Sequence, residues 1–299
     1  MSMTTLPSAS AVELTRQTLA DPALTRRSPG EEFAWAVSQA QDEDVTVPIS
    51  VHLTAAFPLF ATRPRYTVRH LLKVATVTDR TLAYVREAPA DRADAGNSYE
   101  QTPESSFTPT VDAAELTEVS VRVPIPSGLR EQPALLAAFV DYRVLVRLGV
   151  VENESLLHGT PDGRVAGLLN LLELRRGRLT GELGAALTAG AALVEETGGS
   201  CDGITVHPTL YWRLVRDGML GRLAEAGIRV ARTRMMPHHA ALLGDYRAAL
   251  TLLDPGRSTL ALLRKAGPGG EDLVEACTTV GLAVHLPQHF VLLTGGGTP

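Results

Sequence analysis

The stretch ENESLLHGTPDGRVAGLLN, residues 152–170, lies near the middle of the chain and joins two apolar segments. It begins in the last turns of a predicted helix, and Gly159 and Gly163 then end the helix and turn the chain. A second leucine run, GLLN, follows. No catalytic motif occurs in the stretch, so we interpret it as a structural link between two parts of the fold.

A long helix is predicted before this link. Apolar residues there recur every three or four positions, with one polar member: Leu135, Phe139, Tyr142, Val146, Val150, Asn153 and Leu157. This spacing predicts one face of a helix about 40 Å long, at 1.5 Å per residue. Pro133 near its start and Gly159 just past its end are typical helix boundaries.

Two predicted strands precede the helix, and an unusually long polar segment separates them. Residues 71–87 have a strand-like composition, and residues 116–126 alternate between apolar and polar side chains. The nearly thirty residues between them are mostly Ala, Asp, Pro, Ser, Thr and Glu. Hairpin loops usually have two to five residues. The segment is therefore predicted to be either disordered or held by something outside its own domain.

The two ends of the chain differ in character. Residues 1 to about 30 are predicted to form an extended arm, followed by a short helix that Ser28 caps. Residues 45–53 contain Pro48, which favours an extended segment or an edge strand. Beyond residue 170, predicted helices alternate with short strands: helices at 181–197 and 208–218, strands at 203–208, 227–233, 240–246 and 249–254, and one or two closing strands at 281–295.

Composition limits the classes of protein that fit. Hydrophobic residues make up 44% of the 299 residues, which is enough for a sizeable core, and the net charge is −5. Such a charge argues against coating nucleic acid through overall charge, although a local basic patch remains open. The two cysteines form no zinc or disulfide pattern, and the longest clean apolar run, residues 134–140, is too short to cross a bilayer. We therefore expect a soluble cytoplasmic protein in a reducing compartment.

Motifs for catalysis are weak. The sequence has neither a phosphate-binding loop nor a dinucleotide fingerprint. GGSCDG, residues 198–203, approaches a nucleophile elbow, but Asp202 occupies the last glycine position and the motif precedes a strand. Ser200 and Cys201 are therefore the candidate nucleophiles only of an enzyme alternative.

Histidines and arginines give no clear ligand set. The adjacent His238 and His239 point in different directions on any regular element, which suits a shared metal poorly. His207 and His285 lie in apolar strands, where core or interface histidines are common. A run at Arg63, Arg65 and Arg69 suits either phosphate contact or, more simply, a solvated or interface face. No catalytic, cofactor-binding or metal-binding residue is predicted.

The order of these parts resembles the Hong Kong 97-type capsid fold, which tailed phages share with bacterial encapsulins. Five stretches carry the resemblance, which covers the chain from about residue 45: residues 121–143, 152–170, 204–218, 235–254 and 281–293. In that family an extended loop leads to a spine helix, then to an axial domain around the symmetry axes, and the chain returns to a peripheral sheet. Residues 152–170 resemble the hinge after the spine helix.

The resemblance implies an α+β fold with an N-terminal arm, an extended loop and two domains. The implied parts are residues 1–44 as arm and short helix, 45–70 as entry to the peripheral domain, 71–126 as the extended loop, 127–174 as peripheral domain with spine helix, 175–270 as axial domain and 271–299 as closing strands of the peripheral domain. A long loop that no single domain holds is explained if neighbouring subunits hold it.

The resemblance also implies a self-assembling icosahedral shell of many copies, without enzymatic activity. Residues 87–116 lack the lysine through which some phage relatives cross-link their shells, and only about 45 residues precede the resemblance, so a long scaffolding segment is not expected. Both departures favour an encapsulin-type compartment that encloses a cargo enzyme. The alternative is a major capsid protein of a tailed phage, with DNA, portal and scaffold as partners and the virion as its location. A soluble α/β hydrolytic enzyme is the remote alternative.

The resemblance also implies roles for two sets of residues. A cargo peptide is expected near the N-terminal helix, at Phe33, Trp35 and Val37. A loop near a pore on a symmetry axis is expected at Asp217, Gly218, Gly221 and Arg222. Neither cofactor nor membrane is expected to take part.

Overall fold

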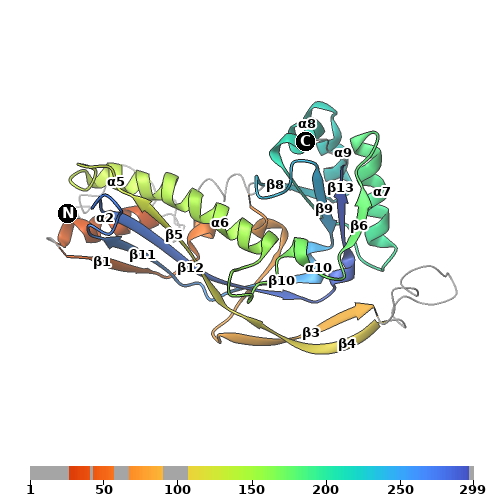
Figure 1. Cartoon of the computed structure of the whole chain (residues 1–299), viewed down its shortest axis with the longest axis horizontal. Coiled ribbons are helices and arrows are strands. Elements are labelled where there is room, and N and C mark those ends of the chain that lie inside the picture. Colours follow the sequence, from red (N-terminus) through yellow and green to blue (C-terminus); the bar gives the residue numbers. More distant parts are fainter. Residues whose placement is uncertain (1–26, 41–42, 57–66, 90–106, 296–299) are drawn as a thin grey trace, which may run out of the picture.

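The computed structural model describes residues 27–40, 43–56, 67–89 and 107–295. The molecule is elongated, with a large sheet under a long helix at one end and a smaller sheet flanked by helices at the other (Figure 1). A two-stranded hairpin projects below the junction of these two parts. None of the described helices is long and apolar enough to cross a membrane.

The large sheet has the strand order β1-β11-β12-β10-β2, and β5 pairs with the other side of β12. Its strands are β1 (Val45–Ile49), β2 (Lys73–Thr76), β5 (Thr117–Pro124), β10 (Leu250–Asp254), β11 (Ser258–Leu263) and β12 (Leu273–Val284). The predicted alternation in β5 is confirmed, because Val119 and Val123 are buried while Ser120 is exposed. Pro48 lies in the edge strand β1, as predicted, where a missing backbone donor costs least.

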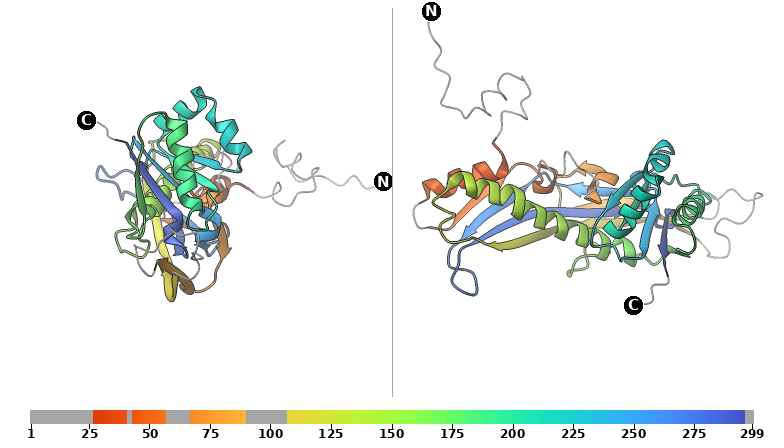
Figure 2. Two further views of the ribbon diagram at one scale, coloured as in Figure 1. Left: turned by 90° about the vertical axis from the view of Figure 1, so that its right-hand side faces the viewer. Right: turned by 90° about the horizontal axis from the view of Figure 1, so that it is seen from above.

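One face of this sheet carries a continuous helical run, seen from above in Figure 2. The run consists of α5 (Pro133–Phe139), a π-helical segment η4 (Val140–Val144) and α6 (Leu145–His158). Three short helical elements lie near it: α2 (Pro29–Gln39), α3 (Leu53–Ala56) and η2 (Arg69–Leu71). The predicted long helix and its end at Gly159 are therefore confirmed.

The face predicted for this helix is confirmed at its end, where Asn153 and Leu157 are buried, but is wrong near its start. Leu135 and Tyr142 are 53% and 58% exposed, whereas Leu136, Val140 and Leu148 are fully buried. With Val144, also fully buried, these residues recur every four positions, a spacing that drifts around a regular α-helix of 3.6 residues per turn. The wider π-helical turn at Val140–Val144 takes up the drift and keeps the stripe against the sheet.

The predicted cap of the N-terminal helix is confirmed and also docks the helix. Ser28 and Glu31 form a reciprocal capping box at the start of α2. Asp141 of η4 accepts hydrogen bonds from Ser28 Oγ at 2.6 Å and from the Gly30 amide at 2.8 Å. A Cβ at Gly30 would lie 2.3 Å from the Ala137 carbonyl oxygen, so this close approach requires glycine.

The smaller sheet has the strand order β6-β13-β9-β7-β8. Its strands are β6 (Arg175–Arg178), β7 (Gly203–Val206), β8 (Arg229–Arg232), β9 (Ala240–Gly244) and β13 (Phe290–Thr294). The helical elements of this half are η5 (Leu168–Asn170), α7 (Leu183–Glu195), α8 (Pro208–Arg216), α9 (Met219–Glu225), α10 (Tyr246–Ala249) and η6 (Pro287–His289). The helices predicted at 181–197 and 208–218 are confirmed as α7 and α8.

The division of the chain at residue 270 differs from the prediction. Strands β10 and β11 belong to the large sheet, although they lie within residues 175–270. Strand β13 lies between β6 and β9 in the smaller sheet, although we expected it to close the large one. Alternation in the sequence identifies a strand but not its neighbours, because pairing is set by packing far along the chain.

The projecting hairpin also differs in its second strand. Strand β3 (Thr81–Pro89) pairs with β4 (Phe107–Glu115), so the return strand begins within the segment that we assigned to the loop. Residues 116–126, which we expected in the hairpin, mostly form β5 and pair with β12. The sequence of β4, FTPTVDAAE, is polar and contains proline, which hides its strand character.

Candidate assembly site

The outer face of the hairpin exposes apolar side chains. Val85 and Val111 stand opposite each other across the two strands and are 52% and 81% exposed. Ala83 and Ala113 form the neighbouring pair on the same face and are exposed as well. A two-stranded hairpin is marginally stable alone in water. This apolar face, Ala83, Val85, Val111 and Ala113, has no covering element among the described residues.

The inner face of the hairpin is fixed to the body of the molecule through His285. The Tyr84 ring meets the His285 ring edge-on at 5.2 Å between centroids. His285 Nδ1 lies 3.0 Å from the Val85 carbonyl oxygen, and the Glu87 amide donates to the His285 carbonyl at 2.8 Å. Arg86 adds an ion pair to Glu173 at 2.7 Å. These contacts hold the hairpin in a defined orientation relative to the body of the molecule.

The turn after the spine helix holds the base of this arm. Asp162 accepts hydrogen bonds from Thr160 Oγ1 at 2.6 Å and from Thr117 Oγ1 at 2.7 Å. These hydrogen bonds, with a smaller contribution from the charge of Arg164, lower the pKa of Asp162 to about 2. Arg164 in turn pairs with Glu115 at the end of β4 at 3.1 Å. Residues 152–170 thus connect the helix to both the hairpin and the smaller sheet.

Two glycines make the turn possible. Gly159 and Gly167 have φ angles of +92° and +80°, which side chains other than glycine rarely adopt. A Cβ at Gly167 would lie 2.3 Å from the Gly159 nitrogen. The backbone at Gly167 therefore packs directly against the backbone at Gly159, with no room for a side chain between them. Asn170 Nδ2 closes the turn by donating to the His158 carbonyl at 2.6 Å.

A buried polar network joins the helix to the rest of the large domain. Glu152 lies 3.0 Å from Arg69 Nε, and Arg69 also contacts Asp254 at 2.8 Å. Thr54 Oγ1 donates to the second oxygen of Glu152, and His52 lies 3.8 Å from the first. Burial is the largest single influence and opposes ionisation of Glu152. The charges of Arg69 and His52 and the hydrogen bonds from Thr54 and Arg69 together outweigh it, so the pKa of Glu152 lies below its usual value. The network links α3, η2, α6 and β10.

This network contradicts both interpretations of Arg69, as a phosphate contact and as part of a solvated or interface face. Arg69 is only 8% exposed and is occupied by two carboxylates, so it belongs to the interior. Arg63 and Arg65, the other two candidates, lie outside the described residues.

The residues expected near a cargo peptide differ in accessibility. Phe33 and Val37 are buried, at 0% and 4% exposure, and contribute to the hydrophobic core of the large domain. Trp35 is 55% exposed, and the Arg27 guanidinium lies 5.3 Å from its ring centroid. Of the three, Trp35 alone presents a large surface for contact.

The expected pore loop is a tight turn between two helices. Asp217 caps the end of α8, and Gly218 adopts a φ of +65° directly before α9 begins. Gly221 and Arg222 therefore lie on a helix, which corrects the prediction of a loop. All four residues are exposed, and Asp217 pairs with Arg216 at 2.8 Å.

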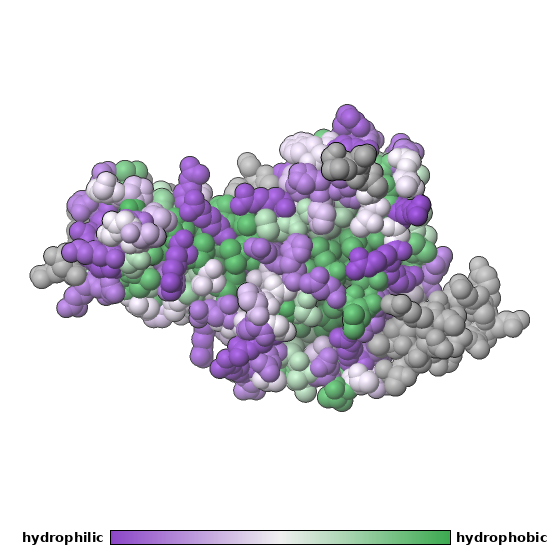
Figure 3. Space-filling model, in the orientation of Figure 1, coloured by the Kyte–Doolittle hydropathy of each residue, from purple (hydrophilic) through white to green (hydrophobic). Residues whose placement is uncertain are grey.

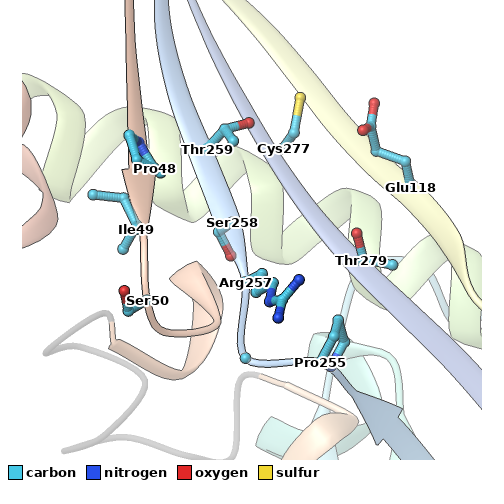
Figure 4. A pocket seen from close by; sticks show the side chains of 11 residues that line it. Pro48, Ile49, Ser50, Glu118, Pro255, Arg257, Ser258, Thr259, Cys277 and Thr279 are labelled. Atoms are coloured by element: carbon cyan, nitrogen blue, oxygen red, sulfur yellow. The ribbon is translucent and has the colours of Figure 1, made fainter. Parts of the chain in front are cut away.

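The described residues show little that suits catalysis. Burial raises the pKa of the Cys201 thiol to about 12, so almost no thiolate forms at neutral pH. A hollow of about 510 Å³ on the open face of the large sheet contains Cys277, Glu118 and Arg257 (Figure 4), and burial raises the pKa of Cys277 to about 11. Among the described residues, no three His, Cys, Asp or Glu side chains gather as a metal site.

One wide face of the molecule is apolar in its middle. In Figure 3, hydrophobic residues gather where the end of α6 meets the smaller sheet, and hydrophilic residues dominate the far end of the large sheet. Apolar patches of this kind on a soluble protein often mark contact surfaces.

Comparison with known proteins identifies the fold. Neither a protein-family model nor a curated protein matches the sequence. A virus-like particle from Pyrococcus furiosus matches 79% of this chain and 95% of its own, with 12% identity and a TM-score of 0.55. Mycobacterium phage Ogopogo matches 77% of this chain and 92% of its own, with 17% identity and a TM-score of 0.56. The capsid of the native GTA particle matches 79% and 98%, with 15% identity and a TM-score of 0.53.

The chain therefore has a capsid fold, in which a long helix crosses one sheet, a second domain follows and an arm projects. Within that class it is the α+β Hong Kong 97-type capsid fold. The fold that the resemblance implied is confirmed by these structural neighbours.

Proposed function

We propose that this chain is the subunit of a self-assembling closed shell, and that the shell is an encapsulin-type compartment enclosing a cargo enzyme. The observation that carries the proposal is the hairpin. Its inner face is fixed to the body by His285 and Arg86, while Val85 and Val111 on its outer face stay exposed. A rigid arm with an uncovered apolar face suits repeated contact with neighbouring copies under symmetry.

The encapsulin form is favoured over the phage form by two features. Residues 87–116 lack lysine, so the hairpin offers no amine for cross-linking. Trp35 on α2 offers an exposed aromatic anchor for a cargo peptide. A major capsid protein of a tailed phage, enclosing DNA with portal and scaffold, is the second candidate, and phage neighbours of the same fold support it. The high thiol pKa of Cys201 gives the hydrolytic alternative no support.

Particle size tests the shell proposal. The full chain, expressed alone, is expected to form megadalton particles by light scattering and closed round shells by electron microscopy. A monomer or small oligomer, also when a lysate of the source organism is added to supply a scaffold, would contradict the shell.

The contents of the particle test the encapsulin form. Particles purified from the source organism are expected to contain one dominant enzyme that carries a short terminal peptide, and Trp35→Ala is expected to reduce its loading relative to Leu193→Ala, a change of another exposed apolar residue. Packaged genomic DNA, together with neighbouring portal and terminase genes, would instead establish the phage form.

A further inference from the structure

Positive charge is concentrated in one segment of an acidic chain. Residues 207–239 contain only two carboxylates, Asp217 and Glu225, against six arginines: Arg213, Arg216, Arg222, Arg229, Arg232 and Arg234. The segment therefore carries +4, while the whole chain carries −5 and the remainder −9. It forms α8, α9, β8 and the turn before β9. Helices α8 and α9 share one hydrophobic cluster with α7, so the three helices cover the same face of the smaller sheet (Figure 1).

Most of this charge is exposed and not neutralised. Arg213, Arg222, Arg229 and Arg234 are exposed, and none forms an ion pair with a carboxylate within the described part of the chain. Arg216 is the exception, because it pairs with Asp217 at 2.8 Å. Unpaired arginines on one small substructure make a positive surface that an anion can approach.

An exposed tryptophan lies within this positive surface. Trp212 is 59% exposed and lies on α8 beside Arg213, one turn before Arg216. The guanidinium of Arg232, from the end of β8, lies 5.0 Å from the Trp212 ring centroid and 4.3 Å from that of the buried Tyr211. Arg232 therefore holds the indole in place from one side and leaves most of it open to solvent.

The second tryptophan of the chain shows that exposure alone is not the signal. Trp35 is similarly exposed, at 55%, and also lies under an arginine, Arg27. Its helix, however, carries Glu31 and Glu32 in the first turn and no basic residue in the last. Trp212 combines an open aromatic ring with surrounding positive charge, and Trp35 does not.

We propose that the basic-aromatic surface, Trp212, Arg213, Arg232 and Arg234, binds single-stranded nucleic acid. Arginines attract the phosphates, and an aromatic ring stacks on an unpaired base irrespective of its identity. The net charge of the whole chain conceals this surface, since binding depends on the local charge. Every residue of this surface belongs to one subunit, so binding can be measured on the unassembled chain.

Fluorescence anisotropy with a labelled oligonucleotide of about 20 nucleotides tests this binding, at about 50 mM and higher salt. The full chain is expected to bind, with an affinity that falls as salt rises. Trp212→Ala is expected to weaken binding roughly tenfold, Trp212→Phe less, and the matched change Trp35→Ala not at all. Arg213→Gln with Arg234→Gln is expected to lower the slope of log affinity against log salt by about 1.4, at about 0.7 per phosphate contact.

Several outcomes would overturn the proposal. Absence of binding at low salt excludes the surface as a nucleic-acid site. Equal effects of Trp212→Ala and Trp35→Ala, or equal binding of a duplex with no dependence on Trp212, exclude base stacking. Trp212→Phe and the arginine pair keep the test decisive if Trp212→Ala does not fold. Measuring the same series on unassembled subunits, obtained by changing Val85 and Val111, separates this result from the fate of the shell proposal.

Discussion

The network around Glu152 and the outer face of the hairpin depart from the usual distribution of side chains in opposite ways. Glu152, Arg69 and Asp254 are charged groups placed in the interior, and each has partners within the chain. Val85 and Val111 are apolar groups placed on the surface, and neither is covered by the described chain. Buried charge is costly unless paired, and exposed apolar area is costly unless covered. The first departure is resolved within one subunit, whereas the second requires another molecule.

This contrast predicts which residues stabilise the isolated subunit and which residues are needed for subunits to assemble. Changes in the network should destabilise the isolated subunit and affect assembly only through folding. Changes on the outer face of the hairpin should leave the isolated subunit folded and prevent assembly.

Glu152→Ala should have the largest effect. The change leaves the Arg69 guanidinium buried with one carboxylate fewer and removes the acceptor of Thr54. Breaking a buried charge pair costs about 3–5 kcal/mol. Urea denaturation of the subunit should show this loss, whereas the exposed neighbour change Glu154→Ala should stay within about 0.5 kcal/mol of the wild type. Similar stabilities for the two variants would show that the network does not hold the domain together.

Gly167→Ala should cause the second-largest loss of unfolding free energy. Gly163 and Gly167 have similar φ angles, +73° and +80°, so alanine is strained by about 1–2 kcal/mol at either position. At Gly163 a Cβ would meet no atom within 4 Å, but at Gly167 it would lie 2.3 Å from a backbone nitrogen. Thermal unfolding should therefore place Gly167→Ala well below Gly163→Ala. Equal melting temperatures for the two variants would mean that the backbone at Gly159 and Gly167 can move apart without a loss of stability.

The fold and its main helices were predictable from the sequence. Periodicity and punctuation identified the spine helix, its end at Gly159, the capped helix after Ser28, and the helices α7 and α8. The resemblance of the five stretches identified the fold, which the structural neighbours confirm. These features are local, because caps, turns and periodic faces are set by residues close in sequence.

The features that could not be predicted depend on partners far along the chain. Glu152 begins the stretch of residues 152–170, yet no residue near it in the sequence indicated that Arg69 and Asp254 would contact it. The buried face of the first part of the spine helix was misplaced because the π-helical turn is not visible as a sequence period. The pairing of β5 with β12 and the position of β13 depend on the sheet as a whole. The hairpin contact through His285 was hidden in the same way.

Replacing the apolar pair on the hairpin should prevent assembly and leave the stability of the subunit almost unchanged, the opposite of what is expected for Glu152→Ala. Val85→Lys with Val111→Glu keeps a favourable cross-strand pair and removes the exposed apolar surface. The unfolding free energy of the subunit should change by less than about 1 kcal/mol, since surface positions contribute little. Particles should disappear in light scattering. The reversed pair, Val85→Glu with Val111→Lys, should behave identically, and normal particles from either variant would contradict the role of this face.

Asp162→Asn should have the smallest effect and a defined pH dependence. The pKa of Asp162 in the folded chain is about 2, below its ordinary value of 3.8, so the folded state binds this proton less readily than the unfolded state does. The carboxylate therefore adds stability that is fully present above about pH 4 and is lost as the pH falls through about 2. The stability difference between wild type and Asp162→Asn should accordingly shrink between pH 4 and pH 2. A difference that stays constant over that range would assign the contact at Thr117 to geometry alone, with no contribution from the charge.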